Sequence, residues 1–394
     1  MLAQSAIVRR DEWEVALDEA IDSTSMVVAN AGHADLVFLF ASHAYAANFP
    51  AMVQRVQAAT RARVLIGCSG QGVIGNAQEI EGKPAVSLLT ASLPGNEMRT
   101  VRLTQSDLES CEGPDDWHYL TGVRPVDVNG WVMFADPFTL DAERLIGALS
   151  NAYPGTPLVG GLASGDFRSQ QTHLFQGDRV HSDGAVAVAL GGDYTIQSVV
   201  SQGADPIGET WTITAAEGNV VKEIGNKPAL EVVAKTLNAL TPDDQRRAQS
   251  NLLVGLAMDE YRDDFNRGNF LIRNIVGIDP NAGALAIAAR PQIGQTFQLH
   301  LRDERAADAD LRALLGQARL DLVGRSPVCA LVCSCNGRGV GLFGYPDHDA
   351  KMISEQLGIN QLAGFFCNGE IGPVGFQNYL HGYTASVALI VPKV

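Results

Sequence analysis

A glycine-rich stretch near the C-terminus gathers side chains that could do chemistry. It reads Gly364-Phe-Phe-Cys367-Asn368-Gly-Glu370-Ile-Gly372-Pro373, and the run Cys335-Asn336-Gly-Arg338 precedes it. Glycine allows a ligand or a second backbone to approach closely. Asn336 and Asn368 could form paired hydrogen bonds, Arg338 could bind a carboxylate, and Glu370 could bind an ammonium. Backbone N–H groups of the glycines could hold anionic oxygen. This inventory suits a zwitterionic small molecule.

The same residues also have a purely structural interpretation. Asn and Arg side chains often cap turns, and Glu370 could pair with Arg338 inside the protein, since charge clusters are structural as well as functional. The residues alone leave both interpretations open.

Catalysis by a thiol would need a histidine base close to the cysteine. Cys367 with His381, or Cys335 with His348, could supply such a pair in a hydrolase or transferase. A buried cysteine more commonly behaves as a small apolar side chain. We therefore expect a binding protein and keep the thiol enzyme as an alternative.

Sequence motifs for zinc binding, serine hydrolysis and haem ligation are incomplete or ambiguous in this sequence. Cys333 and Cys335 form a Cys-x-Cys pair, which lacks the Cys-x2-Cys spacing typical of zinc sites, so we expect no metal. Gly67-Cys-Ser69-Gly-Gln71 lacks the last glycine of a hydrolase elbow. Haem would need axial ligation, and spacing does not choose among the candidates: His43, His173, His300, His348 and His381.

Composition limits the classes of partner. The chain has 394 residues, 46% of them apolar and 19% charged, with a net charge of −15. An acidic protein is a poor partner for nucleic acid or anionic membranes, which attract clustered Lys and Arg. Arg9-Arg10 leads into Asp11-Glu12 rather than an apolar run, so the start is not a signal peptide, and no segment predicts a membrane span. These features favour a cytoplasmic protein.

The glycine stretch belongs to a unit that recurs along the chain. Each copy reads strand, polar loop, helix, strand, glycine loop, strand, which predicts a duplicated βαβ-type element. Gly67, Gly72 and Gly75 of the first copy align with Gly364, Gly369 and Gly372 of the third. The predicted strands and helices are 36–40, 48–60, 64–66 and 85–89 in copy one, 131–134, 141–152, 158–159 and 184–190 in copy two, and 329–332, 350–357 and 362 onward in copy three.

This pattern predicts an α/β protein in which repeated units form two similar halves, with mixed sheets covered by helices. We expect an N-terminal helix within 1–24 and domains at 25–200 and 201–394. Residues 104–121 are rich in acids and predict a solvated connection. The apolar runs 252–257 and 269–277 suggest a fourth, degraded copy. Arg273 stands in the second of these runs and could either reach solvent or contact an anion.

Several motifs of the second half resemble the FIST sensory family. They are Gly268-Asn-Phe-Leu-Ile-Arg273-Asn274, His300-Leu-Arg302-Asp303, Cys333-Ser-Cys335-Asn336-Gly-Arg338-Gly, His348-Asp349-Ala350 and Phe366-Cys367-Asn368-Gly-Glu370-Ile-Gly-Pro373. The resemblance covers about residues 25–390 and implies a FIST N and a FIST C domain. In the first half, Gly67-Cys68-Ser69 fits less fully, because Gly70 and Val73 replace the expected Thr and acid.

The resemblance implies an intracellular sensory module for amino acids or similar metabolites. It implies partners such as histidine kinases or cyclic-dinucleotide enzymes, and both termini look too short for an output domain, so we expect a partner in trans. One subset of the family is described as binding haem for nitric oxide sensing, which is a second alternative. The candidate ligand-binding residues are Arg273, Asn274, Cys335, Asn336, Arg338, Cys367, Asn368, Glu370, His381, Cys68 and Ser69.

Overall fold

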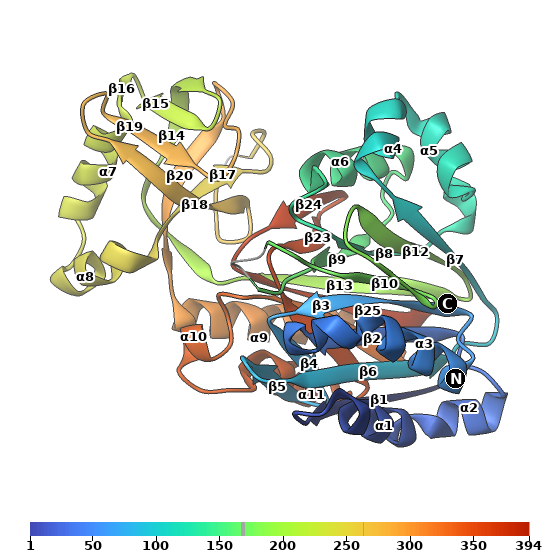
Figure 1. Cartoon of the computed structure of the whole chain (residues 1–394). Helices are drawn as coiled ribbons and strands as arrows, with labels where there is room; N and C mark the ends of the chain where they lie inside the picture. The colour runs from blue at the N-terminus through green and yellow to red at the C-terminus, as the bar shows by residue number, and fades with distance from the viewer. Residues whose placement is uncertain (167–169, 263, 394) are drawn as a thin grey trace. The chain divides into compact units, whose positions relative to one another are not determined.

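The computed structural model describes residues 1–166, 170–262 and 264–393 (Figure 1). The chain forms two compact units. The first contains residues 1–201, 311–380 and the chain from Thr384 onward, and the second contains residues 202–310 with 381–383. The C-terminal segments therefore fold with the N-terminal ones, a grouping that does not follow the order of the sequence. Helices and mixed sheets make up both units, which confirms the α/β class.

Three repeats build the first unit, and the first two are continuous in sequence. Repeat 1 contains β1 (Leu2–Arg9), α1 (Trp13–Ser23), α2 (Ser25–Ala31), β2 (Leu36–Ser42), η1 (His43–Asn48), α3 (Phe49–Thr60), β3 (Val64–Gly70), β4 (Gly72–Gly75), β5 (Gln78–Glu81) and β6 (Ala85–Ser92). Repeat 2 contains β7 (Asn96–Leu103), α4 (Gln105–Ser110), α5 (Pro114–Thr121), η2 (Pro125–Asp127), β8 (Gly130–Ala135), α6 (Ala142–Ala152), β9 (Leu158–Leu162), β10 (Leu174–Gln176), β11 (Arg179–His181) and β12 (Ala185–Gly192).

Repeat 3 is interrupted, because the second unit is inserted after its first strand. It contains β13 (Tyr194–Gln202), α9 (Glu304–Asp321), β21 (Cys329–Cys335), α10 (Val340–Phe343), α11 (His348–Leu357), β22 (Leu362–Cys367), β23 (Glu370–Val374), β24 (Gln377–His381) and β25 (Thr384–Pro392). The predicted strands and helices of all three copies are confirmed, with boundaries within a few residues.

Each repeat contributes one mixed sheet with a parallel pair of strands at its centre. The parallel pairs are β2–β3, β8–β9 and β21–β22, and β6, β12 and β25 lie antiparallel beside them. The hairpin that follows each parallel pair joins a neighbouring sheet. β4 pairs with β22, β10 pairs with β3, and β23 pairs with β9. This cyclic exchange of hairpins ties the three repeats together.

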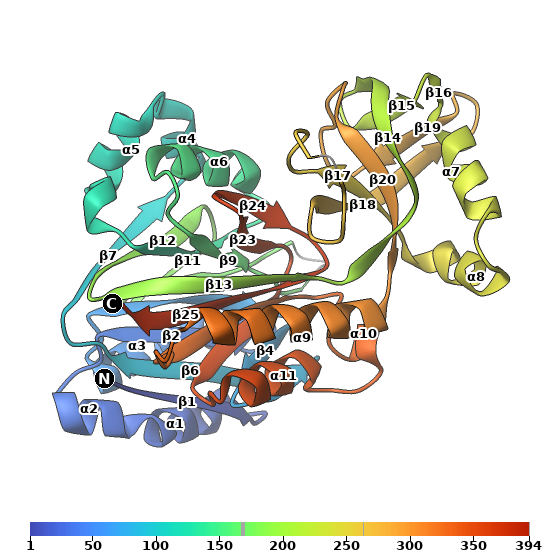
Figure 2. The same ribbon diagram turned by 180° about the vertical axis from the view of Figure 1, so that it is seen from behind.

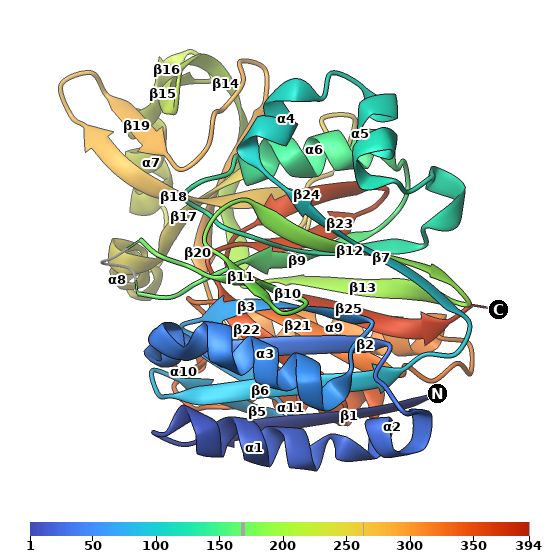
Figure 3. The ribbon, with the colours of Figure 1, turned by 45° about the vertical axis from the view of Figure 1, so that its right-hand side comes forward.

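The inner faces of the sheets share an apolar core. Its aromatic centre takes one ring from each repeat: Phe40, Phe134 and Phe365 have ring centroids 5.0 to 5.7 Å apart. Helices cover the outer faces (Figures 2 and 3). α1 and α3 pack on repeat 1, α5 and α6 on repeat 2, and α9 and α11 on repeat 3. The layers follow from strands that are apolar on both faces, as parallel strands covered on both sides must be.

A glycine opens the loop of each repeat for a steric reason. A Cβ on Gly67, Gly160 or Gly364 would overlap a carbonyl oxygen of the adjacent parallel strand, in Leu39, Met133 and Val332 respectively. Only glycine lets the two strands come this close. The repeated glycines of the sequence therefore mark the contact between paired strands.

The acidic segment 104–121 exposes most of its acidic side chains to solvent, as predicted, but it is helical and not a simple connection. It forms α4 and α5, and its acids cap these helices. Thr104 and Asp107 form a capping box, and the Asp116 carboxylate accepts the Gly113 N–H. Leu108 and Trp117 are buried against α6. The density of acidic residues does not reveal these helices, because two buried apolar side chains hold them against α6.

The second unit is a sheet that closes on itself. Its elements are β14 (Ala204–Glu217), β15 (Val220–Ile224), β16 (Lys227–Pro228), α7 (Ala229–Asn238), α8 (Pro242–Asn251), β17 (Leu252–Ala257), β18 (Phe270–Asp279), β19 (Ala284–Ile287) and β20 (Thr296–Arg302). β14 pairs with both β20 and β15. β17 and β18 are antiparallel, so the suggested fourth βαβ copy is wrong. Among the described residues, no helix is both long and apolar enough to cross a membrane.

Candidate functional site

A pocket of about 370 Å³ opens in the first unit where β2 and β3 end. These are the carboxyl ends of a parallel pair, the edge at which α/β sheets usually bind ligands. All three repeats contribute residues to its lining, and the turn after β5 is part of the contribution of repeat 1. Its polar side chains belong to Ser42, His43, Gln71, Glu81, Lys83, Asp166 and Asn336, and Phe366 adds an apolar wall.

Glu81 brings a carboxylate to this pocket and is held by the chain of repeat 3. Its Oε1 accepts the Val340 N–H at 2.9 Å, at the first residue of α10. Gly339, which precedes Val340, has a φ of +62°, and a Cβ there would overlap Glu81 Oε1. Burial raises the pKa of Glu81, although the Val340 hydrogen bond opposes this.

Of the predicted ligand residues, Asn336 lines this pocket and Asn368 is hydrogen-bonded to it. Asn336 follows β21 and lines the pocket. Its Nδ2 donates to Asn368 Oδ1 at 2.9 Å, and Asn368 Nδ2 donates to the carbonyl of Ala163 at 3.0 Å. The amides thus link the glycine loops of repeats 2 and 3.

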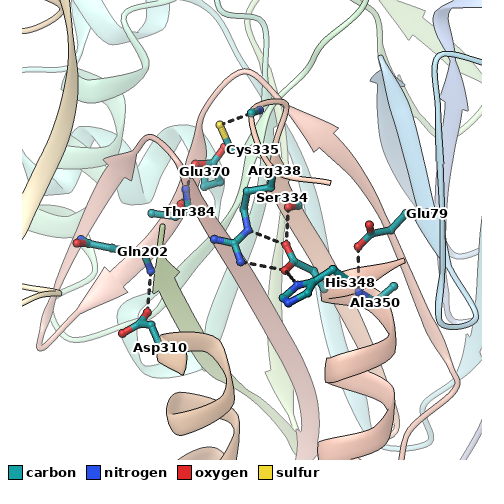
Figure 4. A network of polar contacts seen from close by, with 12 residues as sticks. Glu79, Gln202, Asp310, Ser334, Cys335, Arg338, His348, Ala350, Glu370 and Thr384 are labelled. Atoms are coloured by element: carbon teal, nitrogen blue, oxygen red, sulfur yellow. Dashed lines mark hydrogen bonds and ion pairs between the residues drawn. The ribbon is translucent and has the colours of Figure 1, made fainter. Parts of the chain in front are cut away.

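Arg338 lies away from solvent and forms an internal ion pair. Its side chain is 1% exposed, and Nε and Nη2 donate to the two carboxylate oxygens of Asp349 at 2.7 and 2.9 Å. Ser334 and His348 also hydrogen-bond to Asp349 (Figure 4). Burial would raise the pKa of Asp349, but the guanidinium and these hydrogen bonds hold it below its usual range. The geometry therefore favours the structural interpretation of Arg338, with Asp349 rather than Glu370 as its partner.

Glu79 caps α11 from the neighbouring hairpin. Its Oε1 accepts the Ala350 N–H at 3.0 Å (Figure 4). Its own N–H donates to Asp347 Oδ1 at 2.7 Å. Burial and the nearby Asp349 carboxylate raise the pKa of Glu79 to about 8. Two side chains of β5 therefore hydrogen-bond to repeat 3: Glu79 accepts a backbone N–H of α11, and Glu81 accepts a backbone N–H of α10.

Glu370 and Cys367 form a second buried group. Glu370 is 0% exposed, and its Oε2 accepts the N–H and the hydroxyl of Thr384 (Figure 4). The Cys367 thiol donates to Glu370 Oε1 at 3.2 Å and to the Ser334 carbonyl at 3.3 Å. Burial raises the pKa of Glu370 to about 7, and burial with the Glu370 carboxylate raises the pKa of Cys367 well above its usual value. A thiol with this environment is a weak nucleophile.

The predicted residues of the first glycine loop are also buried. Cys68 is part of the core, and burial raises its pKa well above the usual value. Ser69 Oγ donates to the Ser164 carbonyl at 2.8 Å, and Ser164 Oγ donates to the Phe366 carbonyl at 2.5 Å. These hydroxyls join the loops of the three repeats instead of facing the pocket.

The remaining predicted residues fall in other places. Cys335 is half-buried at the end of β21 and accepts the Gly337 N–H at 3.4 Å. Arg273, Asn274 and His381 belong to the second unit. Arg273 Nη1 donates to the Ile272 carbonyl, and Asn274 accepts the Tyr383 hydroxyl. Among the described residues, no group of three or more His, Cys, Asp or Glu could hold a metal ion.

Sequence reasoning did not name most of the pocket residues as ligand-binding. Gln71, Glu81, Lys83 and Asp166 were missing, and His43 appeared only as a haem candidate. One signal could have found Gln71, because it occupies in copy one the position of Asn368 in copy three. Glu81 ends the β4–β5 hairpin and Lys83 follows it, and this hairpin pairs with a strand far away in sequence, so no local pattern marks these two residues.

Comparison with known proteins gives consistent family matches. The FIST N domain matches residues 35–227 and the FIST C domain matches residues 229–373. An uncharacterized protein of Mycobacterium tuberculosis (strain ATCC 25618 / H37Rv) is 38% identical over 360 residues, which cover 90% of this chain and 91% of that protein. An uncharacterized protein of Mycobacterium bovis (strain ATCC BAA-935 / AF2122/97) is 38% identical over 327 residues, 83% of each chain.

Solved structures are only distantly similar. The crystal structure of cyanuric acid hydrolase from A. caulinodans has a TM-score of 0.36 and 9% identity, covering 100% of this chain and 99% of that one. A second cyanuric acid hydrolase structure has a TM-score of 0.33 at the same identity, with full coverage of both chains. Values this low carry no argument about function. The two domain matches and the 38% identical relatives, in contrast, show that this chain belongs to the FIST family, whose domains are sensory domains of signal transduction.

Proposed function

We propose that this protein is a cytoplasmic, non-catalytic sensor that binds an amino acid or a similar small metabolite in the pocket at the ends of β2 and β3. The observation that carries the proposal is the presence of both charge signs in one small cavity. Lys83 supplies an ammonium, and Glu81 and Asp166 supply carboxylates, in about 370 Å³. That volume is at the small end of the range for ligand sites and suits a metabolite rather than a larger cofactor.

The position of the pocket supports a signalling role. Ser42, Asp166 and Asn336 come from repeats 1, 2 and 3, so a ligand would contact all three. A ligand that binds one arrangement of the repeats more tightly shifts their equilibrium toward it. The signal would pass to a protein bound in trans, such as a histidine kinase or a cyclic-dinucleotide enzyme.

The chemistry of the thiols supports binding rather than turnover. Cys367 is buried, donates its hydrogen to Glu370, and has a raised pKa. A catalytic cysteine needs the thiolate and access to substrate. We therefore propose no enzyme activity and no resident cofactor for this chain.

Native mass spectrometry of the freshly purified chain, followed by a thermal-shift screen with each proteinogenic amino acid at 1 mM, tests the proposal. We expect a retained small mass or a raised Tm for a few related compounds. Glu81→Gln keeps an acceptor for Val340 but removes the charge that would face an ammonium. A charge-assisted hydrogen bond contributes about 1.5 to 3 kcal/mol, so affinity should fall about 10- to 100-fold.

Glu14→Gln is the matched control, because Glu14 is an exposed acid on α1 of the same unit. It should leave binding unchanged. The proposal fails if no metabolite binds while the protein turns over a thioester or amide substrate. A Soret band in protein expressed with haem would instead indicate that the bound group is haem and not an amino acid.

A further inference from the structure

Two cysteines stand opposite each other at the carboxyl ends of β21 and β22. Cys335 and Cys367 are direct partners in the parallel register of these strands, and both are free thiols. Neighbouring strands lie about 4.8 Å apart, within the range of roughly 4.4 to 6.8 Å that separates the Cα atoms of a disulfide. The backbone therefore places a pair of reduced thiols at a separation that a disulfide can span.

Both side chains point to the same face of the sheet. Leu331 and Cys333 of β21 belong to the inner core, and Cys335 continues their alternation along the strand. Cys367 belongs to the same core from β22. Its Sγ leans toward β21, where it donates to the Ser334 carbonyl at 3.3 Å. The two thiols are also close enough for a charge on Cys335 to act on Cys367.

The surroundings of Cys335 favour reaction with a molecule from solution. Cys335 is half-buried, whereas Cys367 is 0% exposed. Cys335 Sγ accepts the Gly337 N–H at 3.4 Å (Figure 4). The guanidinium of Arg338 is near enough to interact with a charge on this sulfur. A backbone donor and a cation both stabilise the thiolate, which is the form that peroxides oxidise.

The surroundings of Cys367 favour reaction with a neighbouring sulfur. Its Sγ–H donates to Glu370 Oε1 at 3.2 Å, so the ionised Glu370 carboxylate is placed to take the proton as the sulfur attacks. A buried thiol is a poor nucleophile toward molecules in solution, but the register holds this one beside its partner. The two cysteines are therefore suited to different steps of one oxidation.

We propose that Cys335 and Cys367 form a reversible redox pair that hydrogen peroxide or a related small peroxide converts to a disulfide. The Cys335 thiolate attacks one peroxide oxygen, so the O–O bond breaks and an S–O bond forms. The hydroxide that leaves takes up the proton that Cys335 released, which gives a sulfenic acid and one water. Cys367 Sγ then attacks Cys335 Sγ, the S–O bond breaks and the S–S bond forms. The second hydroxide leaves as water with the Cys367 proton. The two thiols lose two electrons and the peroxide gains them. This inference does not depend on the proposed function.

The disulfide changes the turn that follows β21. Closure moves the Cys335 sulfur away from Gly337, whose N–H loses its acceptor, and Glu370 loses the hydrogen that Cys367 donates. Asn336 lies between Cys335 and Gly337 in the chain and lines the pocket. The oxidation state of the pair therefore acts on the strand end that carries this pocket residue.

Peptide mapping of the full chain, treated with about a tenfold molar excess of hydrogen peroxide, tests the proposal. Remaining thiols are alkylated in denaturant, and the digest is analysed without reductant. We expect a cross-link between Cys335 and Cys367, with loss of two hydrogen atoms from the intact chain and full reversal by dithiothreitol. Cys333→Ala should retain this cross-link, and Cys335→Ser should abolish it. A cross-link through Cys333, or no intramolecular cross-link in the native chain, would overturn the proposal.

The order of the two steps is tested with dimedone, which traps sulfenic acids. Cys367→Ser keeps a hydrogen-bond donor for Glu370 but removes the second sulfur. Cys335 should therefore accumulate the adduct at least about tenfold above the native chain. An adduct on Cys367 of Cys335→Ser that reaches the same level would overturn the assignment of Cys335 as the peroxide-reactive thiol. If Cys367→Ser does not fold, the cross-link map of the native chain decides the proposal.

Cys111 is the matched internal control. It is half-buried like Cys335, but it follows α4, whereas the other five cysteines lie on β3, β21 and β22. Burial and the carboxylates of Asp116 and Asp107 raise the pKa of Cys111, so its thiolate is scarce. Its oxidation should be at least about tenfold slower than that of Cys335. Cys111→Ser should leave the cross-link unchanged, and equal oxidation rates of Cys111 and Cys335 would overturn the reactivity assigned to Cys335.

Discussion

The glycine loops of repeats 1 and 3 share a backbone plan but serve different purposes. Gly67 and Gly364 make the same close approach to a parallel strand, and Gln71 and Asn368 donate to backbone carbonyls of the same segment of repeat 2. The loops then diverge. Where repeat 1 has Gly70 and Val73, repeat 3 has Cys367 and Glu370, two polar groups that bond to each other inside the protein.

The comparison teaches that the more polar loop is not the one that lines most of the pocket. Repeat 3 uses its polar residues to fix the start of β25 through Thr384, with Glu370 fully buried. Repeat 1 has the plainer sequence, yet its strand ends and its hairpin form most of the pocket. Polarity in the sequence marks both buried networks and binding sites, and only the packing of the loop separates them.

The largest effect is expected where the two loops are identical. Gly67→Ala and Gly364→Ala each place a methyl group on a backbone carbonyl oxygen that cannot move without breaking the parallel pair. We expect each to destabilise the chain by more than about 4 kcal/mol and to abolish soluble expression. Urea unfolding monitored by circular dichroism, or soluble yield where no protein remains, measures the loss.

The control for this prediction is Gly147→Ala in the middle of α6. Apart from the adjacent backbone of α6 itself, no atom lies within 4 Å of the added methyl group, so alanine should stabilise the helix by about 0.5 to 1 kcal/mol. Tolerance of alanine at one loop glycine and not at the other would break the structural equivalence of repeats 1 and 3.

Much of this shared plan could be predicted from local patterns. The apolar run 36–40 became β2, and the helices predicted at 48–60 and 141–152 became α3 and α6. Their spacing revealed the repeat because strands and helices have different apolar periods. The exchange of hairpins could not be predicted, since β4 pairs with β22 almost 300 residues away in sequence and its own sequence does not specify that partner.

The site was harder to predict than the fold. Asn336 was selected for its amide, and it does line the pocket. Arg338 was selected for its charge, but Asp349 lies eleven residues later on the first turn of α11 and pairs with it. Asp349 belongs to one of the family motifs, but nothing in its local sequence indicates that it faces Arg338.

Substitution of Arg338 or Asp349 tests whether this ion pair stabilises the fold of repeat 3 or serves ligand binding. Removal of one partner leaves the other charge buried, which costs about 3 to 5 kcal/mol. We expect Arg338→Met and Asp349→Asn each to lower the free energy of unfolding by that amount, measured by urea titration. The double variant Arg338→Met with Asp349→Asn should lose less than the sum of the two single losses.

An outcome in which Arg338→Met unfolds like the native chain but loses ligand binding would place Arg338 back in a binding role. Lys227→Met, at an exposed lysine of the second unit, controls for the loss of one positive charge. Its surface pair with Glu231 contributes about 0 to 1 kcal/mol, so its unfolding should change little.

The smallest predicted effect is on the pH dependence of stability. It arises from Glu370, whose equivalent position in repeat 1 is Val73 and cannot ionise. The pKa of Glu370 rises from 4.5 to about 7 on folding, chiefly because it is buried. Between these values the unfolded chain has lost the proton while the folded chain keeps it, so stability falls as pH rises through that window. The difference corresponds to roughly 3 kcal/mol at most, and Val73, which has no proton, contributes none of it.

Glu370→Gln therefore removes part of the pH dependence while keeping acceptors for Thr384. Urea unfolding at half-unit steps from pH 4 to pH 8 should show a smaller decline for the variant than for the native chain, with the two curves converging or crossing toward pH 8. Glu79, whose pKa rises to about 8, contributes a decline of the same sign to both proteins, so only their difference isolates Glu370. Equal declines would mean that Glu370 is already ionised in the folded protein at pH 5, and its buried negative charge would then need a positive partner such as an ammonium. The glycine loop of repeat 3 would in that case regain its place as a ligand site.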